Sequence, residues 1–288
     1  MKNKKLLVSV LMTAYNREKF IAEAIESVLL STYVNFELII VDDCSTDKTV
    51  EIALRYAEKD HRIKLYVNEH NLGQFENRNK AAGYAKGIYL KYLDSDDTIF
   101  PWGLAYCVTE MIKFPEASIG MLYLKNRNLE TSFIMSPENA IRDHYFNGSL
   151  LSIGPSGSIF RRDYFELNNG YDTRFDLLSD NFLNIQLTVK APVVFLPKVF
   201  FDYRVHDEQQ YNEKGYIIYG YLYNKELYQY GNLPLKEDEI IYLKKKLEKR
   251  QLVNIGRFFF KTKKLPAIFE IIAITNYKWW YALKYIFY

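Results

Sequence analysis

Aspartate residues gather at two points within the first hundred residues of this 288-residue chain. Asp42 and Asp43 follow one short apolar run, and Asp94, Asp96 and Asp97 follow another. Carboxylates that share one surface repel each other unless a cation lies among them. Mg²⁺ and Mn²⁺ are typically held by one or two carboxylates together with the phosphates of a substrate. The Asp94-x-Asp96 segment is therefore a candidate site for a divalent metal and a diphosphate.

The competing interpretation is that Asp96 and Asp97 only cap the next helix, because aspartate is favoured at helix N-termini. That interpretation would be preferred for an isolated Asp-x-Asp segment. Here Asp42 and Asp43 are expected at the same edge of the fold, and the segment follows a predicted strand. These two features favour the metal–diphosphate site.

The elements around these clusters follow a regular alternation. Short apolar runs predict strands over 6–12, 36–41, 63–67 and 88–93, and apolar residues at helical spacing predict helices over 18–30, 46–57, 75–85 and 101–114. Strand–helix alternation predicts an α/β fold with a mostly parallel central sheet and helices on both faces. Ligands bind beyond the carboxyl ends of such strands. The segments 13–16, 42–43 and 94–97 are expected to meet there.

The second half of the chain is less regular. Strands are predicted over 119–124, 157–160, 193–196 and 200–205, and a helix over 177–189. Beyond Tyr216 the pattern becomes helical, with helices predicted over 237–261 and 266–288. We place a boundary near 212–215, which divides the chain into a catalytic domain over 1–215 and a C-terminal helical, basic and aromatic region over 216–288.

Composition limits the functional class. The net charge of +3 argues against a dedicated nucleic-acid binder. Two isolated cysteines, Cys44 and Cys107, do not form a disulfide framework and fit a reducing cytoplasm. The apolar run after the basic residues 2–5 is too short for a signal peptide, and no stretch of ~20 uncharged apolar residues predicts a membrane span.

Four motifs follow one another in the first hundred residues. They are Val10 to Asn16, Val41 to Thr49, Asn71 to Gly73 with Arg78-Asn79, and Leu93 to Asp97 with Pro101. Each is weak alone, but in this order and spacing they resemble the family 2 glycosyltransferases. The resemblance covers about residues 6–206 and implies the GT-A nucleotide-diphosphosugar transferase fold. It also implies an inverting transfer of a sugar from a nucleotide-diphosphate donor, for which we expect a UDP-sugar.

The resemblance assigns roles to individual residues. It implies that Asp96 ligates Mn²⁺ or Mg²⁺ and that His206, in the segment Tyr203 to His206, closes over the metal or the diphosphate. The expected nucleotide-binding residues lie at the ends of the predicted strands and in the third helix. They are Thr13, Ala14, Tyr15, Asn16, Asp43, Arg78, Asp94 and Ser95.

An inverting transferase needs a base on the acceptor side. The matching segment is Leu177 to Leu183, and Asp180 is our candidate. The family more often has Glu-Asp where this chain has Ser179-Asp180, a departure that removes a neighbouring charge but keeps the presumed base. The alternative is that Asp180 caps the helix. The resemblance also implies that small residues over 154–158 leave room for the acceptor sugar.

The last region carries most of the positive charge. From Tyr216 onward we count 13 Lys and Arg against 6 Asp and Glu, or +7, which leaves −4 for the rest of the chain. Basic residues interleaved with Phe258 to Phe260 and Trp279 to Tyr281 are typical of helices at an anionic membrane surface. Family relatives that build surface glycans act on glycan or lipid-linked acceptors at the inner face of the membrane. Packing on the catalytic domain, or a homodimer interface, remains the alternative.

Two other functions fit the sequence less well. A sugar nucleotidyltransferase usually has a Gly-rich phosphate loop after its first strand, whereas Thr13 to Arg17 contains no glycine. A non-catalytic glycan-binding or scaffold module would not need Asp43, Asp94, Asp96 and Asp180 together. We therefore expect a metal-assisted glycosyltransferase of cell-surface polysaccharide synthesis that does not bind nucleic acid.

Overall fold

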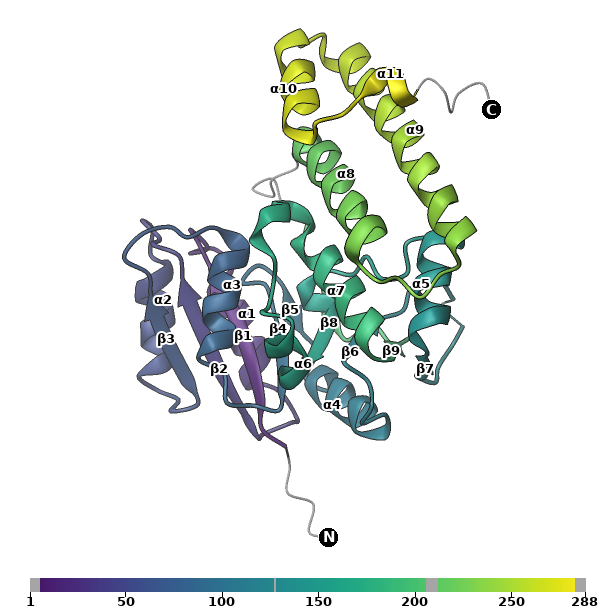
Figure 1. The fold of residues 1–288 in the computed structure, drawn as a ribbon. Coiled ribbons are helices and arrows are strands. Elements are labelled where there is room, and N and C mark those ends of the chain that lie inside the picture. The colour runs from purple at the N-terminus through teal and green to yellow at the C-terminus, as the bar shows by residue number, and fades with distance from the viewer. Residues whose placement is uncertain (1–5, 127, 206–211, 283–288) are drawn as a thin grey trace.

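The computed structural model describes residues 6–126, 128–205 and 212–282. Figure 1 shows a central sheet with helices on both faces and a helical region that extends beyond one edge. The described strands form an eight-stranded sheet in the order β3-β2-β1-β4-β8-β6-β9-β7, with a two-stranded sheet of β10 and β5 beside it.

The first half of the sheet is parallel, as the alternation of elements predicts. Its strands are β1 (Val8–Ala14), β2 (Phe36–Asp42), β3 (Ile63–Val67) and β4 (Tyr89–Tyr92). The intervening helices are α1 (Ile21–Leu29), α2 (Thr49–Ala57) and α3 (Gln74–Gly83). Parallel pairing of β1 with both β2 and β4 brings the carboxyl ends of these three strands to one edge.

The second half mixes directions. The strands β6 (Ile119–Leu122) and β9 (Val193–Leu196) are parallel, whereas β8 (Ser158–Arg161) runs antiparallel to β4 and β6. The helices here are α4 (Gly103–Lys113), α5 (Pro137–Phe146), α6 (Arg162–Leu167) and α7 (Ser179–Lys190). Two short 3₁₀ helices, η1 (Pro155–Gly157) and η2 (Thr173–Leu178), precede β8 and α7.

Alternation along β1 supplies apolar side chains to both faces of the sheet. Val8, Val10 and Met12 pack in a cluster with α1 and α4, whereas Leu11 belongs to a second cluster with α3 and α7. Both clusters are almost completely buried. Because β1 is covered on both faces, its sequence is a nearly continuous apolar run.

Several short elements differ from the sequence prediction. β5 (Thr98–Ile99), β7 (Phe133–Met135), α5 and α6 were not predicted, and the strand expected over 200–205 is only β10 (Phe201–Asp202). β5 and β10 pair with each other across about a hundred residues of sequence. Such short strands depend on a distant partner rather than on their own apolar pattern.

The C-terminal region contains α8 (Glu213–Tyr230), α9 (Glu237–Thr262), α10 (Leu265–Thr275) and α11 (Trp279–Ala282). The single helix predicted over 266–288 is wrong for the described part, because Asn276 ends α10 in the left-handed conformation at φ 47°. None of the helices in the described ranges is both long and apolar enough to cross a membrane.

The helix α8 has two packing surfaces. Tyr223, Leu227 and Tyr228 join the apolar cluster that also contains α3 and α7, whereas Ile217 and Ile218 pack with α9 and α10. The first helix of the C-terminal region therefore completes the core on one face of the sheet. The division at residue 215 stays a prediction, and the core itself continues across it.

Candidate active site

The polar clusters predicted from the sequence meet at the carboxyl edge of β2, β1 and β4. Ala14, the last residue of β1, pairs in register with Asp42, and the Asp43 amide donates to the Ala14 carbonyl at 2.8 Å. The Leu93 amide donates to the Leu11 carbonyl at 3.0 Å, which continues the pairing just beyond β4. The expected convergence at one edge is confirmed.

The loops after β1 and β2 are tied together by side-chain hydrogen bonds. Asp42 is fully buried and accepts from the Ser45 amide at 2.8 Å. Ser45 Oγ in turn accepts from the Asn16 amide at 2.8 Å, and Asn16 Oδ1 accepts from the Thr46 amide at 2.9 Å. Asn16 has φ 52°, a left-handed conformation that asparagine tolerates better than most residues. Asn16 thus holds the loop after β1, which carries Tyr15, against the loop after β2.

Asp43 holds the loop before α3. It is 3% exposed and accepts from the Leu72 amide at 2.8 Å, the Gly73 amide at 2.9 Å and Asn68 Nδ2 at 2.8 Å. Gly73 adopts φ 87°, which a side chain would disfavour. The carboxylate predicted to bind the nucleotide therefore organises the 71–73 loop in this structure, and its nucleotide role stays a prediction.

Arg78 on α3 pairs with Asp94 directly after β4. The distance from Arg78 Nη2 to Asp94 Oδ1 is 2.6 Å, and Arg78 is 3% exposed. The Arg78 guanidinium also lies 5.0 Å from the centre of the Phe75 ring. A buried guanidinium requires a carboxylate partner, because an uncompensated buried charge is strongly destabilising. The pair fixes Asp94 at the edge of the sheet.

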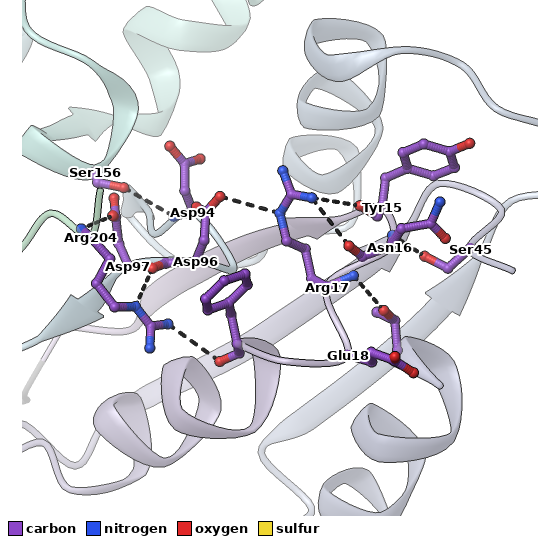
Figure 2. A network of polar contacts seen from close by, with 12 residues as sticks. Tyr15, Asn16, Arg17, Glu18, Ser45, Asp94, Asp96, Asp97, Ser156 and Arg204 are labelled. Atoms are coloured by element: carbon purple, nitrogen blue, oxygen red, sulfur yellow. Dashed lines mark hydrogen bonds and ion pairs between the residues drawn. The ribbon is translucent and has the colours of Figure 1, made fainter. Parts of the chain in front are cut away.

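Arg17, in the loop after β1, makes the corresponding contact with Asp96. Its Nε lies 3.2 Å from Asp96 Oδ2, and its Nη1 donates to the carbonyls of Tyr15 and Asn16 at 3.1 and 3.2 Å. Figure 2 shows Arg17 between the Asp96 carboxylate and the backbone of residues 15–16. Arg17 is not among the residues predicted from the sequence. Its position beside Asn16, opposite a predicted carboxylate cluster, was the available signal.

Asp97 faces inward at the same edge. It is 1% exposed, and burial, with Asp94 as a further contributor, raises the pKa of its carboxyl to about 6. Its Oδ1 accepts from the Arg204 amide at 3.2 Å, and the Arg204 side chain donates to the Asp96 carbonyl and pairs with Glu23. Arg204 therefore connects the segment after β10 to the Asp94–Asp97 segment (Figure 2).

A buried lysine, Lys91, connects the end of β4 to the 3₁₀ helix η1. Lys91 on β4 is fully buried, and its Nζ donates to the Ser156 carbonyl at 2.7 Å and to the Tyr92 carbonyl. Ser156 Oγ accepts from the Asp94 amide at 3.0 Å. Burial lowers the pKa of Lys91 to about 8. Lys91 and Ser156 thus join η1 to the start of the carboxylate segment.

Asp180 lies in the first turn of α7, as the predicted helix boundary implied. It is partly buried, and burial raises the pKa of its carboxyl to about 6, with Arg78 acting in the opposite direction and Asp94 adding to the rise. Its Oδ1 accepts from the following amide, that of Asn181, at 2.7 Å. A carboxyl with a raised pKa close to the Arg78–Asp94 pair is suited to accept a proton near neutral pH.

The other predicted nucleotide-binding residues lie at the same edge. Ala14 and Ser95 are buried, Thr13 is half-buried and Tyr15 is 46% exposed. An exposed aromatic ring beside the strand ends is available to stack on a flat ligand. His206 lies outside the described residues.

The carboxylates at this edge suit a divalent cation that is shared with a substrate. Asp94 and Asp96 provide oxygen ligands, and each carboxylate pairs with an arginine. Within the described ranges, no three His, Cys, Asp or Glu side chains are grouped closely enough to hold an ion by themselves. A cation such as Mg²⁺ commonly takes only one or two carboxylates and completes its shell with water and phosphate. The residues therefore fit a metal that binds together with a diphosphate.

Known structures share this fold. The S. aureus TarS 1–349 structure in complex with UDP has a TM-score of 0.69 and 21% identity, over 91% of this chain and 76% of that one. The mannosyltransferase PcManGT from Pyrobaculum calidifontis, in complex with GDP-Man and Mn²⁺, has a TM-score of 0.64 and 18% identity, over 97% and 84%. These likenesses confirm the predicted GT-A arrangement with its C-terminal helices.

Sequence relatives are more similar over a shorter stretch. The putative teichuronic acid biosynthesis glycosyltransferase TuaG of Bacillus subtilis is 45% identical over 97 residues, which is 34% of this chain and 38% of the relative. The UDP-Glc:alpha-D-GlcNAc-diphosphoundecaprenol beta-1,3-glucosyltransferase WfgD of Escherichia coli is 42% identical over 107 residues, 37% and 42% of the two chains. The matches span about two fifths of these relatives.

The family model supplies the assignment. The model described as glycosyl transferase family 2 matches residues 9–167, more than half of the chain. The match includes β1, β2 and β4 and all the carboxylates at their edge, and it ends before Asp180. The chain therefore belongs to glycosyl transferase family 2.

Proposed function

We propose that this protein is an inverting, metal-assisted glycosyltransferase that moves a sugar from a UDP-sugar to a hydroxyl of a glycan or lipid-linked acceptor in surface-polysaccharide synthesis. The observation that carries the proposal is the arrangement of Asp94 and Asp96 at the carboxyl edge of the sheet, with Asp94 within electrostatic reach of Asp180. Family membership and the names of TuaG and WfgD support the reaction class and the type of product.

The donor would lie across the ends of β1, β2 and β4. Tyr15 is exposed there and would stack on the base, while Thr13 and the adjoining backbone would border the nucleotide. Arg78 and Arg17 would provide positive charge beside the diphosphate. We propose UDP as the nucleotide of the donor, because the TarS structure was determined with UDP and the name of WfgD gives UDP-Glc as its donor.

Mn²⁺ or Mg²⁺ would be held by Asp96, with Asp94 beside it and His206 as a further predicted partner. When bound, such a cation neutralises the negative charge that develops on the departing nucleotide diphosphate. In this structure Arg17 forms an ion pair with the Asp96 carboxylate. When the cation binds, Arg17 would either share this carboxylate with it or move away. PcManGT, which has the same fold, was determined with Mn²⁺.

Asp180 would act as the base. Its carboxylate would take the proton of the acceptor hydroxyl as that oxygen forms a bond to the anomeric carbon. The bond from the anomeric carbon to the diphosphate oxygen breaks in the same step, and the proton remains on Asp180. The raised pKa favours this transfer, because a carboxyl with a pKa of about 6 is a stronger base than an ordinary aspartate and is still ionised at neutral pH.

Two alternatives lead to different measurements. A sugar nucleotidyltransferase would consume a nucleoside triphosphate, and the loop after β1 lacks the glycine-rich phosphate cradle that such enzymes use. A non-catalytic glycan-binding or scaffold module would bind saccharides without turnover. The Arg17–Asp96 and Arg78–Asp94 ion pairs and the raised pKa of Asp180 favour a glycosyltransferase over both alternatives.

The deciding experiment measures donor binding and slow donor hydrolysis for a panel of UDP-, GDP- and dTDP-sugars, with Mn²⁺, with Mg²⁺ and with chelator. We expect turnover of one UDP-sugar that requires metal and is lost in Asp96→Ala. Asp163→Ala, an exposed carboxylate on α6, is the matched control that should keep turnover. Absence of binding for every nucleotide sugar under every metal condition would refute the proposal.

The C-terminal region would place the enzyme at the inner face of the membrane. Phe260, Phe269 and Trp280 are 71%, 64% and 58% exposed, and Lys263 and Lys264 lie between the first two. Large apolar side chains next to lysines suit an anionic lipid surface. The alternative is that a second copy of the chain covers these side chains in a homodimer.

A further inference from the structure

A groove lies between α8 and α9, apart from the ends of β1, β2 and β4. It has a volume of about 620 Å³ and is bordered by α5, by the 148–152 loop and by the start of α7. Leu178 and Asn181, which flank Ser179 and Asp180 in the sequence, are among its lining residues. The groove therefore includes the sequence neighbour of the predicted base, and most of its other lining residues come from α8 and α9.

Positive charge is concentrated along one side of this groove. Lys246, Arg250 and Arg257 of α9 all line it. Their spacing of four and seven residues places them on one face of the helix. None of the three forms an ion pair with a carboxylate in the described part of the chain. Glu213, the acidic residue that lines the groove, is already paired with Lys261 at 2.6 Å. The groove consequently carries uncompensated positive charge.

The remaining lining is polar and aromatic. Tyr223 and Tyr228 of α8 face the groove, and the charge of Arg250 acts on both phenols, lowering their pKa values against the larger rise that burial causes. Gln251 also lines the groove. It is 2% exposed, and its Nε2 has no hydrogen-bond partner among the described residues. A buried amide without a partner is costly, which indicates that a further polar group completes this site.

We propose that this groove binds the phosphate group of a phosphorylated saccharide acceptor, with Arg250 and Arg257 on the phosphate and the sugar hydroxyl directed at Asp180. The inference rests on the proposed transferase function and specifies its acceptor class. Guanidinium groups bind phosphate oxygens in a bidentate manner, and three cations match a phosphate or diphosphate better than a single carboxylate. Tyrosine rings and side-chain amides suit the saccharide part.

The donor site does not account for this groove. The donor diphosphate is expected beside Asp94 and Asp96, whereas the groove is formed by α5, α7, α8 and α9. Asp180 is related to both, because Arg78 and Asp94 influence its pKa and the adjacent residue, Asn181, lines the groove. A base between a donor edge and a cationic groove is the arrangement that transfer to a phosphorylated acceptor requires.

The test is a titration of the full chain with glucose 1-phosphate and with neutral methyl glucoside, both in the presence of saturating UDP so that the donor site is filled. Binding is followed by phosphorus NMR and by saturation-transfer NMR. We expect the wild type to prefer the phosphorylated sugar, and Arg250→Ala and Arg257→Ala each to weaken its binding about tenfold, as loss of a charge-assisted bidentate contact predicts. Arg250→Lys should fall between.

Lys249→Ala is the matched control, since it removes one positive charge from the neighbouring position of α9 without touching the groove. Equal weakening in Lys249→Ala and Arg250→Ala would overturn the proposal, as would equal binding of both sugars by the wild type. Sedimentation with phosphatidylglycerol vesicles separates a lipid headgroup from a saccharide phosphate. Loss of vesicle binding in Arg250→Ala with unchanged glucose 1-phosphate binding would also overturn it.

Failure of this inference is distinguishable from failure of the proposed function. UDP binding by the wild type reports on the donor edge alone and does not involve α9. If UDP binds and the arginine variants match the Lys249→Ala control, the acceptor assignment fails and the transferase proposal stands. If UDP does not bind, the transferase proposal itself fails.

Discussion

Replacing Asp180 by asparagine should abolish transfer and stabilise the fold at neutral pH. The carboxyl is partly buried near Asp94, and its pKa is raised from 3.8 to about 6. Ionised Asp180 is therefore less favourable in the folded protein than in the unfolded chain. Asn181 donates its amide to Oδ1 at 2.7 Å, and an asparagine oxygen can accept the same bond. The substitution removes the charge and keeps the local hydrogen bond.

The size of the effect follows from the pKa shift. A pKa shift of about two units corresponds to at most about 3 kcal/mol, at about 1.4 kcal/mol per unit, and partial exposure of the side chain reduces this to about 1–2 kcal/mol. Below the unfolded pKa the carboxyl is protonated in both states, so Asp180 costs nothing there. The cost grows as the pH rises from about 4 to about 6 and is constant above. We expect a higher melting temperature for Asp180→Asn at pH 7, by about 2–4 °C per kcal/mol.

Activity should change in the opposite direction. Loss of a general base typically lowers the rate about 10²- to 10⁴-fold. In the wild type, a base with a pKa of about 6 is about nine-tenths ionised at pH 7 and about one-tenth at pH 5, so the rate should fall about tenfold between them. Scanning fluorimetry from pH 4 to 8 and initial transfer rates over the same range measure both effects, while UDP binding should be retained.

Asp176→Asn is the matched control, because Asp176 is an exposed carboxylate just before α7 whose pKa is also raised by burial. It should retain activity. A lower melting temperature of Asp180→Asn at pH 7 would contradict the expectation that the ionised Asp180 carboxylate destabilises the fold. Full activity of Asp180→Asn together with inactivity of Asp176→Asn would assign the base to Asp176 and refute the reasoning.

Three further predictions concern the supports of the site. Asp43→Ala should lower the free energy of unfolding by about 1–3 kcal/mol in denaturant titrations and weaken UDP binding, because the Leu72 amide loses its acceptor and the Gly73 amide and Asn68 Nδ2 each lose one of theirs; unchanged stability would contradict this. Lys91 has a pKa lowered to about 8, so the unfolded chain binds more protons between pH 8 and 10 and the wild type should gain stability relative to Lys91→Met over that range; parallel stability curves would refute it. The double variant Phe269→Ser and Trp280→Ser should sediment several-fold less with anionic vesicles, whereas Leu54→Ser on α2 should not; equal sedimentation of the two variants would exclude docking through these side chains.

Local pattern was sufficient for the central elements. The runs that predict β1, β2 and β4 are buried on both faces, so their continuous apolar character identifies them without knowledge of their neighbours. The short elements were missed for different reasons. β5 and β10 contain two residues each and exist through their mutual pairing. The start of α5 carried a usable signal, since Ser136 caps the helix and Pro137 follows it.

The candidate active site was likewise predictable only in part. Sequence placed Asp94, Asp96 and Asp180 correctly at the strand edge and the helix start, because parallel strands must end at one edge and helices begin at identifiable residues. It did not indicate that Asp43 holds the 71–73 loop or that Arg17 reaches Asp96. Those contacts join segments about 30 and 80 residues apart, and many cations in the chain could have met the same carboxylates.

By itself, the sequence determined the element types, the parallel first half of the sheet and the edge where carboxylates gather, because these depend on apolar periodicity and on the direction in which strands run. Tertiary structure alone decided which arginine pairs with which aspartate, that α8 completes the core beside α7, and that cations of α9 line a groove together with Asn181, the neighbour of Asp180. These features depend on which faces of distant elements come together. Apolar spacing shows that a helix has a buried face but not what that face will meet.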